Sequence, residues 1–468
     1  MVSAEKSPDL VLEKASKLVT PDSSEIKKLE AVALKVRGLI EATLEREASD
    51  PKPEIVLGGS YARGTWLKGN HDIDYFLLYP VEFSREKLES VAVRSAMEAM
   101  AGFQVNLRYA EHPYVEAHVD KVRVNLVPCY KVARGEWRSA ADRSPFHTKY
   151  IASKLDERMN TEARLFKKFV KSLGVYGAEV KVQGFSGYVC EVLTLWKGSF
   201  LGTLLGISKW KQHEVISLEE YDKDLADSFE SPVVILDPVD TTRNLGTAIS
   251  ARNVARLVLQ SRRFLLDPSL SYFESKKVTK LSMNPKSKEL LLRTAIVTFR
   301  NEKRSPDILW GQLRRSESAI SEKLSKLDFQ VLRSTAASNE ETHCAFLFLL
   351  AETSLGKVHT RKGPEYFRAQ EVDSYLSKNK RRTLLTWIAE DGRLESIFER
   401  DAFSMEVQKS LRQLFSKKFL DSIGLSEEIK KEVRRNHKIS DGWKTLKSSS
   451  KQNLDWLRRE VIALVSEE

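Results

Sequence analysis

The segment GGSYARGTWLKGNHDIDYF, residues 58–76, constrains the fold more than any other part of the chain. A short apolar run, Ile55 to Leu57, precedes its two glycines, and an alternating run begins after His71. This order predicts a strand, a tight turn and a second strand. Asp72 and Asp74 then share one strand face, because successive side chains alternate between the two faces. Two carboxylates at this spacing repel each other unless a cation lies between them.

The same segment carries groups suited to both a metal and a phosphate. Asp72 and Asp74 form half of a cradle of hard oxygen ligands, the type that Mg²⁺ prefers. The glycines let the backbone approach a phosphate, Ser60 adds a hydroxyl donor, and Arg63 can contact two phosphate oxygens. A lone D-x-D is usually a pair of solvated acids. Joined to G-G-S-x-x-R-G-T, it indicates phosphoryl or nucleotidyl transfer.

The wider pattern predicts a multidomain α+β chain. Residues 24–47 have helical spacing with Ser24 as the N-cap, and residues 104–132 alternate as two or three strands. These elements predict a small mixed sheet backed by helices. Long amphipathic helices follow, one closed by Gly174 and the next broken near Gly202. Further strands pair around a helix beyond residue 268, and the final hundred residues return to helix.

Charge and length narrow the function classes. The 468 residues are 41% hydrophobic and 30% charged, and they predict a globular chain of about three domains. No apolar run reaches the length of a membrane span, and no secretory signal is found. The net charge of +11 fits either a thermally robust surface or a polyanionic partner. Basic clusters at 378–382 and 430–438 favour RNA.

The cysteines indicate the compartment. Cys129, Cys190 and Cys344 lie far apart in apolar settings. Their spacing suits neither a disulfide framework nor a zinc site. We therefore expect buried free thiols and a cytoplasmic protein.

Several longer segments match one family. They are LRYAEHPYV, VPCYKV, DRSPFHTKY, GVYGAEVKVQGFSGYVCEVL, DPVDTTRN and RKGPEYF. With the G-S before D-x-D, the chain resembles the archaeal (class I) CCA-adding enzymes of the polymerase-beta nucleotidyltransferase superfamily, from about residue 25 to at least 370. The resemblance implies template-independent addition of C, C and A to the 3′ end of tRNA from CTP and ATP, with Mg²⁺ as cofactor and pyrophosphate released.

The resemblance also implies roles for individual residues. The metal-binding and catalytic positions fall on Asp72, Asp74 and Asn125. Arg243 matches an arginine that helps to read the incoming base. The nucleotide-binding positions are Ser60, Arg63, Glu111, His112, Ser144, His147, Lys167, Tyr176 and Arg243. Without the family, Lys167 would be interpreted as a solvated cation and His147 as an ordinary surface histidine.

One of these positions departs from the family pattern. Where the family usually has a third aspartate, VRVNLVPCY places Asn125. Asparagine can give an oxygen to a metal, but it carries no charge and accepts no proton. Asp120 lies five residues earlier, so a regular strand would point it to the opposite face. Reduced activity is therefore expected, and Asn125→Asp should raise incorporation by about tenfold to a thousandfold.

Two alternative functions stay open on the sequence alone. One is a related poly(A)-type RNA nucleotidyltransferase, and the other is a catalytically weakened protein that binds tRNA and nucleotide. For both alternatives the predicted partner is RNA. For a CCA-adding enzyme the predicted partner is the acceptor and T-stem of tRNA. The sequence leaves a homodimer open and predicts no membrane association. The expected parts are a catalytic head (1–150), a helical nucleotide-binding domain (151–268), a mixed α/β tRNA-binding domain (269–370) and a basic helical tail (371–468).

Overall fold

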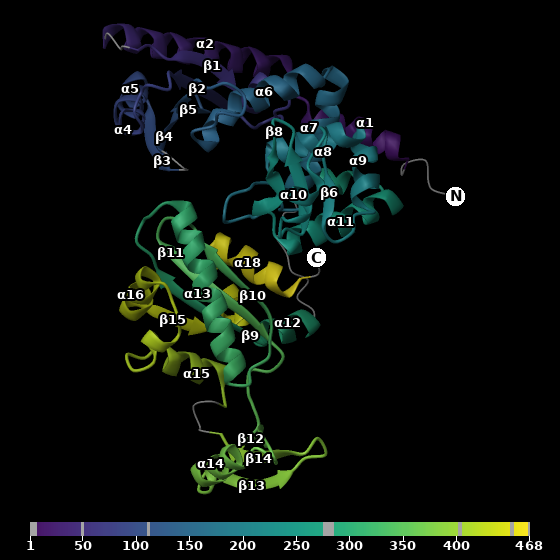
Figure 1. Cartoon of the computed structure of the whole chain (residues 1–468), viewed down its shortest axis with the longest axis vertical. Helices are drawn as coiled ribbons and strands as arrows, with labels where there is room; N and C mark the ends of the chain where they lie inside the picture. Colours follow the sequence, from purple (N-terminus) through teal and green to yellow (C-terminus); the bar gives the residue numbers. More distant parts are fainter. Residues whose placement is uncertain are drawn as a thin grey trace. The chain divides into compact units, whose positions relative to one another are not determined.

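The computed structural model describes residues 7–47, 51–109, 113–274, 285–400, 405–449 and 454–466. The chain divides into two compact units, Met1–Lys276 and Lys277–Glu468 (Figure 1). In the described ranges we find no helix that is both long and apolar enough to cross a membrane. Each unit is described by itself below.

The first unit begins with the predicted small mixed sheet. Its strand order is β1-β2-β5-β4-β3, and β2 and β5 run parallel while the other neighbours are antiparallel. The residues from 104 onward give three strands. The bounds are β1 (Glu54–Gly58), β2 (Asp72–Tyr79), β3 (Gln104–Tyr109), β4 (Pro113–Val119) and β5 (Val122–Tyr130).

Two helices cover one face of this sheet, and the other face carries a row of polar side chains. α2 (Ser23–Arg46) lies along the sheet, and α5 (Val93–Ala99) packs beside it (Figure 1). Both helices bury apolar residues against Ile73 and Tyr75 of β2. The prediction of Ser24 as N-cap is wrong, because Asp22 accepts hydrogen bonds from the first-turn amides in a capping box. The opposite face carries Asp72 and Asp74.

The rest of the first unit is a helical layer with a small sheet. Its core contains interlocking aromatic rings of Phe169, Phe200 and Phe264. The predicted break near Gly202 lies instead at Gly198, whose φ of +72° ends α8 in the left-handed conformation. The main elements are α1 (Pro8–Val19), α6 (Arg143–Lys154), α7 (Glu157–Ser172), α8 (Gly187–Lys197), α9 (Phe200–Ile207), α11 (Ala251–Leu266), β6 (Glu214–Ile216), β7 (Val233–Asp237) and β8 (Asp240–Asn244).

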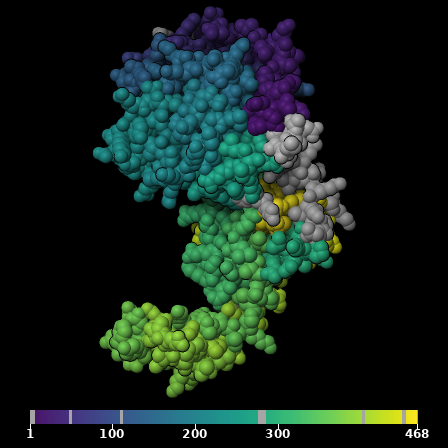
Figure 2. Space-filling view, turned by 90° about the vertical axis from the view of Figure 1, so that its right-hand side faces the viewer, coloured from purple at the N-terminus to yellow at the C-terminus, as the bar shows by residue number. Residues whose placement is uncertain are grey.

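The second unit holds two separate sheets. The first has the order β10-β11-β9-β15 and packs against α13 (Pro306–Lys326) and α18 (Asp455–Val465). The second has the order β12-β14-β13 beside α14 (Ala369–Asn379), in the yellow-green lobe of Figure 2. The strands are β9 (Thr294–Arg300), β10 (Val331–Ser338), β11 (His343–Leu350), β12 (Val358–Glu365), β13 (Thr383–Ile388), β14 (Arg393–Glu399) and β15 (His437–Ser440).

The structure tests the sequence predictions for the final hundred residues and for the three cysteines. The final hundred residues do not return only to helix, because β13, β14 and β15 lie within them. They also contain α15 (Val407–Leu414), α16 (Glu427–Arg435) and α17 (Gly442–Ser449). The three cysteines are buried free thiols, as predicted. Burial raises the thiol pKa of each, to about 12 for Cys344.

Candidate active site

A row of polar side chains crosses the face of the first sheet that lies opposite α2 and α5. Asp74 of β2 pairs with Asn125 of β5, and Asn125 pairs in turn with Glu116 of β4. Directly paired residues place their side chains on the same face. Asp72 pairs with Arg123 one step along the same face. We call Asp72, Asp74, Asn125 and Glu116 the acid row.

Each member of the acid row has one charged or polar partner. The amide nitrogen of Asn125 donates to Asp74 Oδ1 at 2.8 Å, and Arg123 donates to Asp72 Oδ2 at 2.7 Å. Arg108 donates to Glu116 Oε1 at 2.8 Å. Burial raises the pKa of Asp74, and the nearby charge of Asp72 raises it further. The row therefore holds more negative charge than its neighbours compensate.

The glycine turn beside the row is fixed by close packing. α3 (Gly59–Ala62) starts directly after β1, and Gly59 has a φ of +67°. A Cβ at Gly59 would lie 1.8 Å from Asp74 Oδ2, so only glycine fits. Ser60, which is partly exposed, directly follows Gly59 in this turn, and Arg63 is the C-cap residue of α3. Arg63 also lies close enough to Asp74 to lower the pKa of that carboxyl, against the effect of burial.

The donor set of the acid row fits a divalent cation. Asp72 and Asp74 supply two carboxylates, and Mg²⁺ in nucleotide enzymes is commonly held by one or two carboxylates plus substrate phosphates. The Oδ1 atom of Asn125 is buried and has no hydrogen-bond partner, which marks an oxygen available to a ligand. Across the described part of the chain, no three acidic, histidine or cysteine side chains already converge as a metal site.

A second cluster surrounds Glu191 of α8, whose side chain is fully buried. Arg63 Nε lies 2.9 Å from Glu191 Oε2, and Lys167 Nζ lies 2.6 Å from Oε1. Lys167 also donates to the Thr65 hydroxyl at 2.9 Å. Although burial raises it, these two cations hold the pKa of Glu191 below its usual value. Lys167 is 1% exposed, so the interpretation as a solvated cation is wrong.

Tyr176 joins this second cluster. A Cβ at Gly187 would lie 2.7 Å from the Tyr176 hydroxyl and 3.8 Å from Lys167 Cε, so the two side chains meet above that glycine. Burial raises the pKa of the Tyr176 phenol. Arg63, Lys167 and Tyr176 are therefore brought together, with two cations sharing one carboxylate.

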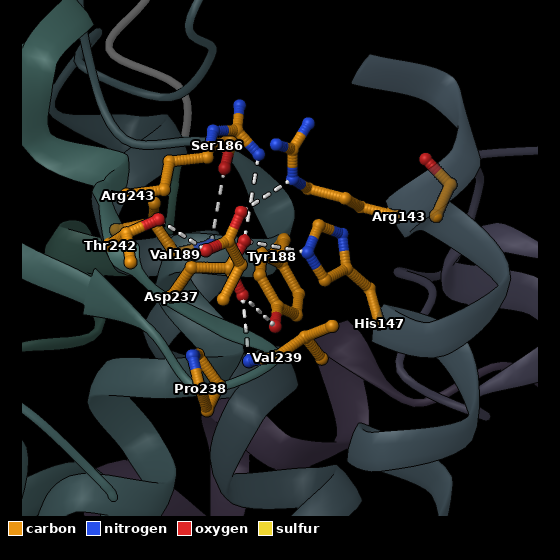
Figure 3. Close-up of polar contacts among 12 residues, drawn as sticks. Arg143, His147, Ser186, Tyr188, Val189, Asp237, Pro238, Val239, Thr242 and Arg243 are labelled. Carbon is orange, nitrogen blue, oxygen red and sulfur yellow. Dashed lines mark hydrogen bonds and ion pairs between the residues drawn. The ribbon is translucent and has the colours of Figure 1, made fainter. Parts of the chain in front are cut away.

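A third cluster centres on Asp237 at the end of β7 (Figure 3). His147 Nε2 lies 2.7 Å from Asp237 Oδ2, and the Tyr188 hydroxyl donates to Oδ1 at 3.1 Å. His147 stacks on Tyr188 with ring centroids 4.1 Å apart, and it is buried rather than on the surface. Arg243 extends toward the same carboxylate, 3.5 Å away, and keeps 41% of its side chain exposed.

Asp237 is the main residue that sequence reasoning missed. The motif DPVDTTRN was noted, but only its arginine was given a role. The available signal was an aspartate at the very end of an apolar strand, where a buried carboxylate needs charged or hydrogen-bonding partners. Tyr188 donates to Asp237 and lies on α8 three residues before Glu191, so one helix carries residues of both clusters. Burial raises the pKa of the Tyr188 phenol.

The other predicted positions are less closely engaged. Ser144 lies on α6 with a partly exposed side chain, one residue after Arg143, which pairs with Asp240 at 2.9 Å. Asp120 lies in the turn between β4 and β5, with a φ of +50°, and pairs with Lys35 at 3.0 Å. It therefore does not contribute to the acid row. Glu111 and His112 lie outside the described residues.

Three family models match successive parts of the chain. A nucleotidyltransferase domain matches residues 36–152, and the second domain of tRNA nucleotidyltransferase matches residues 161–274. The C-terminal domain of CCA-adding enzymes matches residues 293–442. The first match contains the acid row, Arg63 and His147, and the second contains Lys167, Glu191 and Asp237.

Curated relatives cover most of the chain. A CCA-adding enzyme of Saccharolobus shibatae is 36% identical over 85% of this chain and 90% of its own length. Those of Sulfolobus acidocaldarius and Pyrobaculum neutrophilum are 33% and 36% identical over 92% and 80% of this chain, and 97% and 86% of their own lengths. A solved structure of the Cid1 poly(U) polymerase is more distant, with a TM-score of 0.45 and 16% identity over 56% of this chain and 97% of that one. The chain belongs to the family of CCA-adding enzymes.

Proposed function

We propose that the chain adds C, C and A to the 3′ end of tRNA from CTP and ATP, with Asp72 and Asp74 holding Mg²⁺. One observation carries the assignment of the site. Two carboxylates share a strand face directly beside a glycine turn that a single added methyl group would close. The curated relatives are CCA-adding enzymes, and neither the poly(A)-type enzyme nor the weakened binding protein is favoured.

The residues of the acid row and the turn would divide the work of the transfer. The 3′-hydroxyl oxygen bonds to the α-phosphorus of the nucleotide, the bond to the bridging oxygen breaks, pyrophosphate leaves, and the hydroxyl proton is released to water. When bound, Mg²⁺ neutralises the charge that develops on the phosphoryl oxygens. Asp72 and Asp74 would hold it, and Asn125 offers a neutral oxygen. Ser60 and the glycine turn would bind the triphosphate.

The cluster around Glu191 would favour the negative triphosphate. Its two cations, Arg63 and Lys167, exceed the single carboxylate by one charge. The excess attracts an anion, because opposite charges interact strongly where solvent is scarce. Lys167 would act mainly by fixing Glu191 and hence Arg63, since its own ammonium is enclosed. Tyr176 closes the same side of the site.

The cluster around Asp237 would position the groups that meet the base. Asp237 holds His147 and faces Arg243, whose exposed guanidinium can present parallel donors to a base edge. His147 and Ser144 would line the nucleotide site from α6. We include Glu111 and His112 in this proposal from the family resemblance alone.

The second unit would hold tRNA through its phosphates. The cations of 378–382 are exposed, and the described residues provide no ion pair for Lys378, Lys380, Arg381 or Arg382. A surface of unpaired cations suits a polyanion. We place the protein in the cytoplasm, because its buried thiols suit a reducing compartment. The four predicted parts and a homodimer stay predictions.

The test is incubation of the purified chain with tRNA that lacks its 3′ CCA, in Mg²⁺. With CTP alone the product should grow by two nucleotides, with ATP alone by none, and with both by three. A run of A from ATP alone would favour the poly(A)-type alternative. No extension, despite retained tRNA binding, would favour the binding protein.

A further inference from the structure

The centre of the acid row is uncharged. Asn125 lies between Asp74 and Glu116, and its free oxygen carries no negative charge. Sites that bind the attacking and leaving oxygens of a phosphoryl transfer often use two cations about 4 Å apart. Asp72 and Asp74 alone supply two charges for such a pair. A third carboxylate is therefore expected on the same face.

Glu116 is the acidic side chain that the row places there. It is 6% exposed, although glutamate is rarely buried without a functional or pairing reason. Neighbouring strands lie about 4.8 Å apart, so Asp74 and Glu116 stand about 10 Å apart at the backbone. Glutamate is one methylene longer than aspartate. Its carboxylate can therefore reach across Asn125 toward Asp74, where an aspartate on β4 would fall short.

The strand register places acidic side chains on both sides of Asn125. Asp74 of β2 and Glu116 of β4 each pair directly with Asn125, and Asp72 pairs with Arg123 two residues earlier on the same face. The amide nitrogen of Asn125 donates to Asp74 at 2.8 Å, and its buried oxygen has no hydrogen-bond partner. Carboxylates from β2 and β4 therefore flank an oxygen that is available to a ligand.

We propose that Glu116 is a ligand of a second divalent cation and replaces the acid that Asn125 cannot provide. The proposal rests on the proposed nucleotide transfer. Glu116 would turn from Arg108 toward Asp74 when nucleotide and tRNA are bound. Arg108 is 40% exposed. When Glu116 turns away, water can therefore solvate the Arg108 guanidinium, and no unpaired charge is buried.

The test compares two variants that break the same ion pair from opposite sides. Glu116→Gln keeps the shape and a hydrogen-bonding oxygen but removes the charge. Arg108→Gln leaves the carboxylate in place. In single-turnover addition of C, Glu116→Gln should be about a hundredfold slower and Arg108→Gln within threefold of the parent. Asn125→Asp added to Glu116→Gln should recover at least tenfold.

The second readout counts cations and does not depend on turnover. Mn²⁺ bound per protein is measured by electron paramagnetic resonance, with a non-hydrolysable CTP analogue and tRNA lacking its CCA end. The parent and Arg108→Gln should bind one more Mn²⁺ than Glu116→Gln. Thermal melting checks the fold, and Glu116→Asp, which keeps the charge but shortens the reach, replaces Glu116→Gln if that variant does not fold. It should show the same loss of one Mn²⁺.

Three results would overturn the proposal. They are a parental rate in Glu116→Gln, a parental Mn²⁺ count in that variant, and an equal loss in Arg108→Gln, which would make Glu116 a structural partner only. Failure of the proposed function looks different. In that case the parent itself would not extend tRNA.

Discussion

The acid row and the cluster around Glu191 are adjacent, but their charge balances are opposite. The row brings three carboxylates, Asp72, Asp74 and Glu116, against the guanidinium groups of Arg123 and Arg108. The Glu191 cluster brings two cations against one carboxylate. A magnesium nucleotide has the complementary arrangement, with a cation beside a polyanion. From this difference we infer that the net negative charge of the acid row attracts the magnesium ion and that the net positive charge of the Glu191 cluster attracts the triphosphate.

The largest effect is expected from the acid row itself. Asp74→Ala removes a cation ligand and should lower single-turnover addition of C by a thousandfold or more. Affinity for tRNA, measured by filter binding, should stay within a few-fold, because we propose that the tRNA phosphates contact the second unit. Asp72→Ala should behave in the same way. If both variants add C at the parental rate at limiting Mg²⁺, then Asp72 and Asp74 do not hold the cation that the reaction needs.

The Glu191 cluster should instead show its largest effect in stability. Glu191→Gln leaves Arg63 and Lys167 facing each other without a carboxylate, and breaking a buried pair from one side costs about 3 kcal/mol or more. Urea denaturation of the full chain measures the loss. Glu13→Gln, which breaks an exposed pair with Lys17, is the matched control and should not move the transition. An equal loss of unfolding free energy in Glu191→Gln and Glu13→Gln would mean that the buried Glu191 carboxylate stabilises the fold no more than an exposed ion pair does.

Asn125→Asp sharpens the comparison by adding one charge to the row. The sequence alone predicts a gain of about tenfold to a thousandfold in incorporation. With Glu116 already present, we expect the lower end, about tenfold, in single-turnover addition of C. The gain should be larger in the Glu116→Gln background. A variant slower than the parent would show that the row tolerates no further negative charge.

The smallest effect concerns two basic runs in the second unit. In the run at 430–438, Lys430 and Arg434 pair with Asp421, whereas the described residues give the cations of 378–382 no such partner. Removing four phosphate contacts should reduce the slope of log affinity against log salt by about 3. The variant changes Lys378, Lys380, Arg381 and Arg382 to Gln.

Its matched control changes four exposed lysines of α1 and α2 and should leave the slope within about 0.5. The control set is Lys14, Lys17, Lys27 and Lys35. Point changes are preferable to truncation, because β15 of the tail pairs with β9 and completes the sheet. An unchanged slope in the first variant would place the tRNA contacts elsewhere.

Much of the local structure could be predicted because it follows from nearby residues. The alternation of side chains along a strand predicts that Asp72 and Asp74 share one face, and the order of helices and strands in residues 24–132 predicts a small mixed sheet. The errors came from competing local signals. Asp22 caps α2 in place of Ser24, and Gly198 ends α8 before Gly202 because it adopts the left-handed conformation.

The unpredicted parts of the site depend on long-range pairing. Glu116 is nine residues from Asn125 in sequence, but the antiparallel register of β4 and β5 places the two side by side. Lys167 and Glu191 lie on different helices, so their pairing could not be inferred from helical spacing. Asp237 holds His147 from ninety residues away. Side-chain type indicates the chemistry, but only the tertiary fold brings the partners together.

The most direct test of the opposed charges is to locate the cation. Crystals of the chain with tRNA lacking its CCA end, a non-hydrolysable CTP analogue and Mn²⁺ would be measured for anomalous scattering. We expect one peak within about 2.5 Å of carboxylate oxygens of Asp72 and Asp74, a second beside Glu116, and the triphosphate on the side of Arg63. A cation bound only by the nucleotide, with Asp72 and Asp74 still on Arg123 and Asn125, would contradict the account.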